Sequence, residues 1–275
     1  MSVSQIKNIE FDVKELKEFP EHDISNRIKL SFKWLPEGIE NLLDGGCSYG
    51  YGTRYFRAKS KKVFGIDLNP KHIEIAVRRY KDIIFKCCSL ENTEFEELFF
   101  DAVVINDVLE HTHDKIQTLN EMNRILKPGG TIIISTPHKG LFTLLDPYNY
   151  GYYLRKCFPW LYKGMFKFIR LIKVGKIPKE FNPEHQEKHF HYSLKDYIKM
   201  LNQSGFSGNY TIEKVFHSGL FIEVFTMNLE SILNILLPIR VVRILLKPFY
   251  WLSQIDYWIP YGIFAYNIAV KLKKK

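Results

Sequence analysis

Residues 42–50 read LLDGGCSYG, an apolar run that ends in an acid and continues as a glycine-rich turn. Glycines such as Gly46 and Gly50, in a turn that opens a helix, let the backbone approach a ligand at the carboxyl edge of a parallel sheet. Asp67 stands 23 positions after Asp44, at the end of the next apolar run. An acid at that point can accept hydrogen bonds from both ribose hydroxyls. Together, the turn and the second acid predict a cofactor that contains a nucleoside.

The spacing of the glycines separates two classes of such cofactors. From Asp44 the turn reads D-x-G-x-x-x-G. A dinucleotide site needs G-x-G-x-x-G, so that a pyrophosphate can lie on the amino terminus of the helix. A sulfonium cofactor has no phosphate and tolerates the different turn, and Asp44 suits a ligand that carries ammonium and sulfonium charges. The turn therefore favours a sulfonium cofactor.

The segment around this turn, residues 39–138, has the pattern of a parallel sheet. Short β-branched or aromatic runs alternate with amphipathic helical ones, which is typical of βαβ units. A helix predicted at residues 114–126 ends in KPGG, where basic charge, proline and glycine stop a helix before the next strand. Strands are expected at residues 41–43, 62–66, 83–85, 102–105 and 131–135.

Three further segments flank this core. Residues 1–38 include IKLSFKWL, which reads as a helix and predicts an N-terminal helical cover. Residues 139–190 are rich in aromatic and basic side chains and read as an insertion. The fold then resumes over residues 191–275, with a second, hydrophobic insertion at residues 229–260. In that part a helix is expected at 192–206, and strands are expected at 210–215, 220–227 and 263–272.

Four motifs in order make the chain resemble class I S-adenosylmethionine-dependent methyltransferases of the small-molecule type. They read LLDGGCSYG, VFGIDLNP, FDAVVINDVLEH and ILKPGGTIIISTP. The type includes the ubiquinone-biosynthesis enzymes, and the overall layout is also similar to methyltransferases of bacterial glycan assembly. The resemblance implies a Rossmann-like, doubly wound α/β fold, in which a mostly parallel seven-stranded sheet has an antiparallel last strand. The helical aromatic and basic insertions are additions to that fold.

The same resemblance implies S-adenosylmethionine as the cofactor and assigns its contacts. Around the methionine part it places Asp44, Gly46, Cys47 and Gly50; at the ribose, Asp67 and Leu68; at the adenine, Ser89 and Leu90; beneath the sulfonium, Asn106 and Asp107. Taken singly, each glycine also suits an ordinary turn and Asp67 an ordinary cap. The chain departs from the pattern at Ser48, where the family usually has glycine. It also has Ser89 where many relatives place an acid.

Two histidines are candidates for the base that a hydroxyl acceptor requires. Methyl transfer is an in-line displacement, so the enzyme mainly holds donor and acceptor together and removes a proton. His138 follows the fifth strand and His111 follows the fourth, and both emerge at the active edge of such a sheet. We expect His138 to be the base. The alternatives are that His138 caps the following turn and that His111 orders its own loop.

A further histidine cluster borders the first insertion, in PEHQEKHFHYS. It consists of His185, His189 and His191, with Glu184 beside them. The spacing matches no specific ligand motif, and the methyltransferase signature requires no metal. We therefore expect no metal site and interpret the segment as a solvated or substrate-facing loop.

The net charge of +9 is concentrated in the first insertion. Basic segments interleaved with tryptophan and tyrosine suit an anionic membrane surface. They also suit a helical lid over the substrate, and less well RNA. Strand four ends in INDV rather than in the N-P-P-Y turn of many DNA methylases, so nucleic acid is not the expected partner. No uncharged apolar run reaches the roughly 18 residues that a membrane span needs.

Together these features predict O-methylation of a sugar or a lipid-linked glycan. A quinone or isoprenoid phenol is the alternative acceptor, and a catalytically inactive donor-binding scaffold is the alternative of another class. Four cysteines without metal-ligand spacing and the lack of a signal-like first segment favour a reducing, cytoplasmic location, peripheral to the inner face of the membrane. The oligomeric state is left open by the sequence.

Overall fold

The computed structural model describes residues 25–141, 143, 146–174, 189–220 and 222–275, which form two compact units. The described residues of the first unit are 25–136, 194–215 and 269–275. The described residues of the second unit are 137–141, 143, 146–174, 189–193, 216–220 and 222–268. Both insertions predicted from the sequence, residues 139–190 and 229–260, fall within the second unit.

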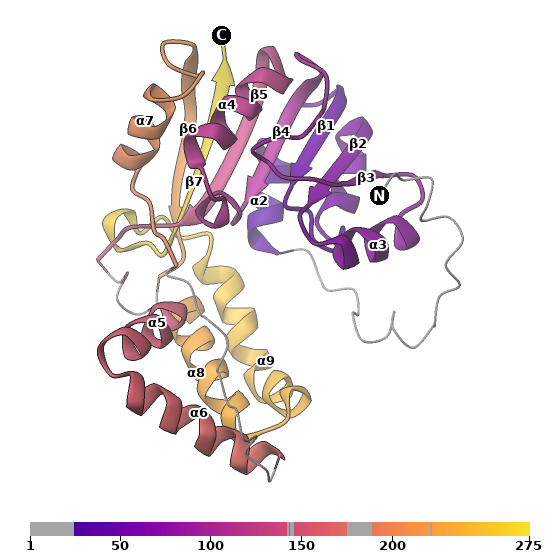
Figure 1. The fold of residues 1–275 in the computed structure, drawn as a ribbon. Coiled ribbons are helices and arrows are strands. Elements are labelled where there is room, and N and C mark those ends of the chain that lie inside the picture. Colours follow the sequence, from indigo (N-terminus) through magenta and orange to yellow (C-terminus); the bar gives the residue numbers. More distant parts are fainter. Residues whose placement is uncertain (1–24, 142, 144–145, 175–188, 221) are drawn as a thin grey trace. The chain divides into compact units, whose positions relative to one another are not determined.

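The strands form one seven-stranded sheet in the order β3-β2-β1-β4-β5-β7-β6 (Figure 1). The pairs β1–β2, β1–β4, β2–β3 and β4–β5 are parallel, and the last strand, β7, runs in the opposite direction. This topology confirms the predicted doubly wound fold. The strands are β1 (Ile39–Gly45), β2 (Ser60–Asp67), β3 (Ile84–Cys87), β4 (Phe100–Asn106), β5 (Leu126–Pro137), β6 (Tyr210–Ser218) and β7 (Asn267–Lys274).

The central strands are apolar because both of their faces are covered. Leu42 and Leu43 in β1 are fully buried, as are residues 102–105 in β4. Parallel strands buried on both faces read as continuous hydrophobic runs. Gly45 at the end of β1 pairs with Ile66 of β2 and with Ile105 of β4. The carboxyl ends of these strands therefore meet at one edge of the sheet, where the predicted cofactor residues follow them.

The helices of the first unit begin at side-chain caps. Ser25 accepts a hydrogen bond from the backbone at the start of α2 (Asn26–Trp34), Asn69 does so for α3 (Pro70–Arg79) and Asp114 for α4 (Lys115–Ile125). Such caps satisfy backbone N–H groups that have no partner within the helix. The helices expected near residues 28–35 and 114–126 are confirmed. The one expected at 192–206 is shorter, since α7 covers Leu194–Asn202.

The second unit contains four helices among its described residues. They are α5 (Pro147–Cys157), α6 (Pro159–Val174), α8 (Ile222–Leu236) and α9 (Ile239–Asp256). The strand predicted at residues 220–227 is wrong, because α8 covers residues 222–227. Short apolar runs are ambiguous between strand and helix, and here packing of α8 against α9 decides the outcome. The last strand begins later than the predicted residue 263, because residues 262–264 form a 3-10 turn. None of the described helices has the length and hydrophobicity needed to cross a bilayer.

Candidate functional site

The turn after β1 is anchored to the end of β2. The backbone N–H groups of Gly46 and Cys47 both donate to the carbonyl of Ile66, at 2.8 and 2.9 Å. The N–H of Ser48 donates to one oxygen of Asp67 at 3.0 Å, and the N–H of Asn69 donates to the other at 2.8 Å. A carboxylate can accept about four hydrogen bonds, so Asp67 holds the turn and still has lone pairs for a ligand.

The conformation of this turn depends on left-handed backbone angles. Gly46 has φ +78° and Gly50 has φ +77°. A Cβ added to Gly46 would lie 2.2 Å from a methyl carbon of Val108, so no larger residue is accommodated without a shift. Ser48 also has a positive φ, +48°. Glycine is the residue that adopts this region at least cost, which explains why the usual family residue there is glycine.

Asp44 lies beneath the turn rather than at its surface. Its carboxylate accepts a hydrogen bond of 2.6 Å from the hydroxyl of Thr53, and both residues are buried. Burial raises the pKa of Asp44 to about 6, although the Thr53 hydroxyl acts in the opposite direction. A group that titrates near neutrality in this position is sensitive to a nearby positive charge, which would favour its ionised form.

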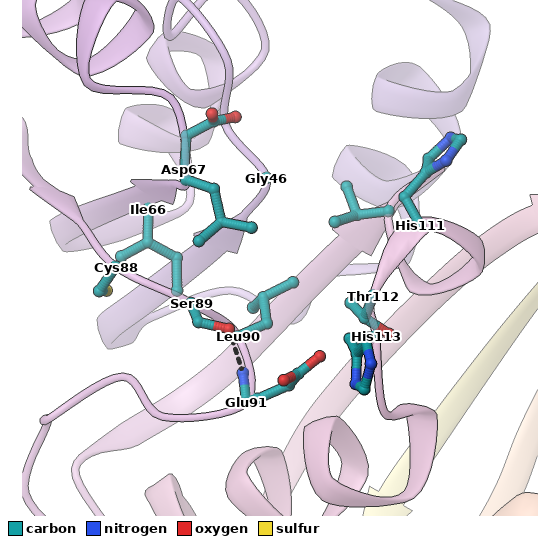
Figure 2. A pocket seen from close by; sticks show the side chains of 12 residues that line it. Gly46, Ile66, Asp67, Cys88, Ser89, Leu90, Glu91, His111, Thr112 and His113 are labelled. Carbon is teal, nitrogen blue, oxygen red and sulfur yellow. Dashed lines mark hydrogen bonds between the residues drawn. The ribbon is translucent and has the colours of Figure 1, made fainter. Parts of the chain in front are cut away.

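A cavity of about 340 Å³ opens at the carboxyl edge of the sheet (Figure 2). This volume lies at the lower end of the range for small-molecule sites. Segments that follow four strands form its walls. The lining residues are Gly46, Ile66, Asp67, Leu68, Cys88, Ser89, Leu90, Glu91, Val108, His111, Thr112 and His113. In Figure 2, Asp67 and His111 lie on opposite sides of this space.

Half of the residues predicted from the sequence line this cavity. They are Gly46, Asp67, Leu68, Ser89, Leu90 and His111. Leu68 is 70% exposed, which leaves an apolar surface beside Asp67 for a flat ring. Ser89 accepts a hydrogen bond of 3.1 Å from the N–H of Glu91, so its hydroxyl orders its own loop (Figure 2). The other predicted residues do not line the cavity and are Asp44, Cys47, Gly50, Asn106, Asp107 and His138.

Asn106 connects three elements at the end of β4. Its side-chain oxygen accepts hydrogen bonds of 2.9 Å from Ser31 of α2 and from Ser135 of β5. Its side-chain nitrogen is buried and has no hydrogen-bond partner among the described residues. The oxygen therefore fixes the orientation of the amide, and the nitrogen remains as a donor for a ligand.

The residues that follow Asn106 carry a group of charges. Asp107 has φ +53° and forms an ion pair of 2.7 Å with Arg27 of α2. Glu110 is buried, and burial together with the charge of Asp107 holds its pKa well above the usual value. The shift favours the neutral form of Glu110 relative to an exposed carboxyl group.

The two candidate bases belong to different units. His111 lines the cavity of the first unit and is exposed. His138 belongs to the second unit, where it is buried, with Nδ1 3.0 Å from the carbonyl oxygen of Ala265. That contact requires a proton on Nδ1 and leaves Nε2 as the basic nitrogen. Burial also lowers the pKa of His138, which favours the neutral ring that a base requires.

The sequence analysis did not predict half of the cavity wall. The residues without a prediction are Ile66, Cys88, Glu91, Val108, Thr112 and His113. Most of them follow the carboxyl end of a strand, which is the one sequence signal that points to them. From the predicted histidine cluster, His185 and Glu184 lie outside the described residues. His189 and His191 belong to the second unit.

Residues 43–134 match the model of a family described as "Methyltransferase domain". Every residue that lines the cavity falls within this segment. The chain is 33% identical over 156 residues to the demethylmenaquinone methyltransferase of Staphylococcus saprophyticus, covering 53% of this chain and 60% of the relative. It is 27% identical to the ubiquinone biosynthesis O-methyltransferase of Dechloromonas aromatica, over 58% of this chain and 69% of the relative.

A third relative is a probable S-adenosylmethionine-dependent methyltransferase of Mycolicibacterium smegmatis, 29% identical over 40% of this chain. The chain spans 44% of that relative and 60% of the menaquinone enzyme. Among solved structures, a geranyl diphosphate methyltransferase in complex with its methyl donor matches with a TM-score of 0.55 at 13% identity, over 90% of this chain and 84% of the other. The comparisons confirm the resemblance to S-adenosylmethionine-dependent methyltransferases and the fold that it implies.

Proposed function

We propose that this chain, whose residues 43–134 form a methyltransferase domain, transfers a methyl group from S-adenosylmethionine to a lipophilic acceptor. The observation that carries the proposal is the cavity at the sheet edge, because its whole lining lies in the segment that matches the family. Gly46 brings bare backbone to the cavity wall, and Asp67 offers carboxylate lone pairs to ribose hydroxyls. The exposed face of Leu68 suits the adenine side of the nucleoside.

Bound S-adenosylmethionine supplies an electrophilic methyl group on a sulfonium. The protein has to hold the acceptor in line with that methyl group and to take a proton from a hydroxyl acceptor. Asn106 contributes a buried side-chain N–H that has no partner among the described residues, which suits hydrogen bonding to the cofactor or the acceptor. His138 and His111 remain the two candidates for the base.

Replacing each histidine by glutamine distinguishes these two candidates. Loss of a general base lowers kcat by about 10²–10⁴-fold and leaves donor binding intact. We expect that result for His138→Gln, since its ring is buried and its lowered pKa favours the neutral form. A loss confined to His111→Gln would instead assign the base to the cavity wall.

Two observations favour an isoprenoid quinone precursor or phenol as the acceptor. The two relatives with assigned acceptors described above are named for menaquinone and ubiquinone, and neither is named for a sugar. The second unit exposes large apolar side chains, among them Trp160 and Ile244, each 72% exposed, and Trp251, 62% exposed. Basic residues such as Lys163 and Lys167 accompany Trp160 on α6. Such a surface suits contact with an anionic membrane in which a lipid acceptor is dissolved.

A lipid-linked glycan, the acceptor favoured by the sequence analysis, would be presented at the same kind of surface. We therefore test both with purified protein, radiolabelled S-adenosylmethionine and anionic vesicles that contain either polyprenylated phenols or lipid-linked saccharides. Label in the phenol supports the proposal, and label only in the saccharide moves the acceptor to the glycan class. Donor binding by the full chain without transfer to either class would favour the inactive scaffold.

A further inference from the structure

We propose that the second unit holds a divalent ion of the zinc type on Asp146, His189 and His191. This inference goes beyond methyl transfer, which itself needs no metal. Asp146 precedes α5, and the two histidines form a His-x-His pair before α7. Nδ1 of His189 and Nε2 of His191 lie 2.6 and 3.0 Å from the same Asp146 oxygen. The three potential ligand atoms lie within 4.8 Å of one another.

The burial of this cluster suits a bound cation. The side chain of Asp146 is 0% exposed, and those of His189 and His191 are 13% and 3% exposed. A buried carboxylate is costly unless a counter-charge or a metal compensates it. A divalent ion among the three side chains would supply such a charge.

The orientation of His191 is a second, independent indication. Its Nε2 is buried and makes no hydrogen bond with any described residue, although an Asp146 oxygen lies only 3.0 Å away. The nitrogen is therefore close to the carboxylate but is not oriented to donate to it. A metal ion between the two atoms would accept the nitrogen lone pair and attract the carboxylate at the same time.

The donor set favours zinc over magnesium or calcium. Two imidazole nitrogens and one carboxylate oxygen form a familiar zinc set, whereas magnesium and calcium prefer oxygen ligands alone. In a tetrahedral zinc site, ligand atoms at about 2.0–2.2 Å from the metal lie about 3.3 Å from one another. The two observed contacts to Asp146 need to lengthen by only about 0.3–0.7 Å to reach this spacing. A fourth position would remain for water or an oxygen-bearing ligand.

The backbone around the site is held in place before any ion binds. Asn149 of α5 accepts a hydrogen bond from the N–H of His189 and donates one to its carbonyl, both at 3.1 Å. The ring of His191 packs against Tyr266, with 6.1 Å between ring centroids. These contacts fix the histidine segment next to Asp146, so ion binding requires little ordering of the chain.

The test is a zinc titration of the full chain, stripped of metal and monitored by competition with a chromogenic chelator. Cys87, Cys88 and Cys157 are replaced by serine in all proteins, because free thiolates also bind zinc. We expect one tight equivalent of zinc per chain. Asp146→Asn and His191→Gln should weaken binding by more than about 100-fold, the upper end of the effect of losing an outer-shell partner.

His217→Gln is the matched control, because it removes another half-buried imidazole of the same unit that is not one of the three ligands. It should leave the zinc affinity unchanged. A cooperative thermal unfolding transition shows that each variant is folded. Cobalt added to the wild type should give the visible absorption of a tetrahedral nitrogen- and oxygen-ligated site, a result that depends on no variant. A folded wild type with neither tight zinc binding nor this spectrum overturns the proposal, as does equal affinity in all variants.

Discussion

Replacing Gly46 by alanine tests the turn on which the donor site depends. Two costs add in this variant. Alanine at φ +78° costs about 1–2 kcal/mol of left-handed strain. Its Cβ would also lie 2.2 and 2.9 Å from the two methyl carbons of Val108, an overpacking that costs about 1–3 kcal/mol. We therefore expect Gly46→Ala to lower the free energy of unfolding by about 2–5 kcal/mol.

Gly208→Ala is the matched control for the strain alone. Gly208 has φ +69°, and nothing lies within 4 Å of an added Cβ. This variant should lose only about 1–2 kcal/mol and should bind S-adenosylmethionine normally. Gly46→Ala should weaken donor binding at least about tenfold, which corresponds to 1.4 kcal/mol, because the clash displaces a wall of the cavity.

Urea denaturation and calorimetric titration measure both quantities. The double variant Gly46→Ala/Val108→Ala removes the clash and keeps the strain. Once the stability lost in Val108→Ala alone is subtracted, the double variant should be more stable than Gly46→Ala by part of the overpacking cost. Equal destabilisation by Gly46→Ala and Gly208→Ala, with unchanged donor affinity, would refute the reasoning.

Three further outcomes follow from the same structure. Ser48→Gly should stabilise the protein by up to about 1.5 kcal/mol in urea denaturation, since it relieves about 1–2 kcal/mol of left-handed strain at φ +48° against a cost of roughly 0.5–1 kcal/mol for glycine. A less stable variant contradicts this. The pKa of Asp44 is raised from 3.8 to about 6, so the folded state binds this proton more tightly and loses stability as pH rises from about 4 to 6. Asp44→Asn should remove that loss, so its free energy of unfolding should gain up to about 3 kcal/mol relative to wild type across this pH range. Parallel pH profiles of stability for the two proteins would argue against this. The protein should sediment with anionic vesicles and be released by salt. Lys163→Glu on α6 should weaken this binding by about 1 kcal/mol or more, whereas Lys81→Glu in the first unit should not. Equal effects of the two variants would remove the basis for a membrane-binding face on α6.

Local sequence signals were sufficient for half of the cavity wall at the sheet edge. The acid at the end of a strand, the glycine spacing and the second acid predicted Gly46 and Asp67, and both line the cavity. These signals succeed because strand periodicity, positive φ and helix capping are decided by near neighbours in the chain. Parallel βαβ order then brings the strand ends to one edge of the sheet, so the position of a residue after a strand also predicts its place in space.

Tertiary packing decided the features that near neighbours do not control. Residues 222–227 have a strand-like composition, yet they are helical because α8 packs against α9. Asn106 is oriented by Ser31 and Ser135, which lie 75 and 29 positions away in the chain. Asp146 lies 2.6 Å from His189, 43 positions later in the chain, and no spacing in the local sequence predicts this pair. Contacts of this kind depend on which surfaces are buried against one another, and that is a property of the folded chain rather than of any short segment.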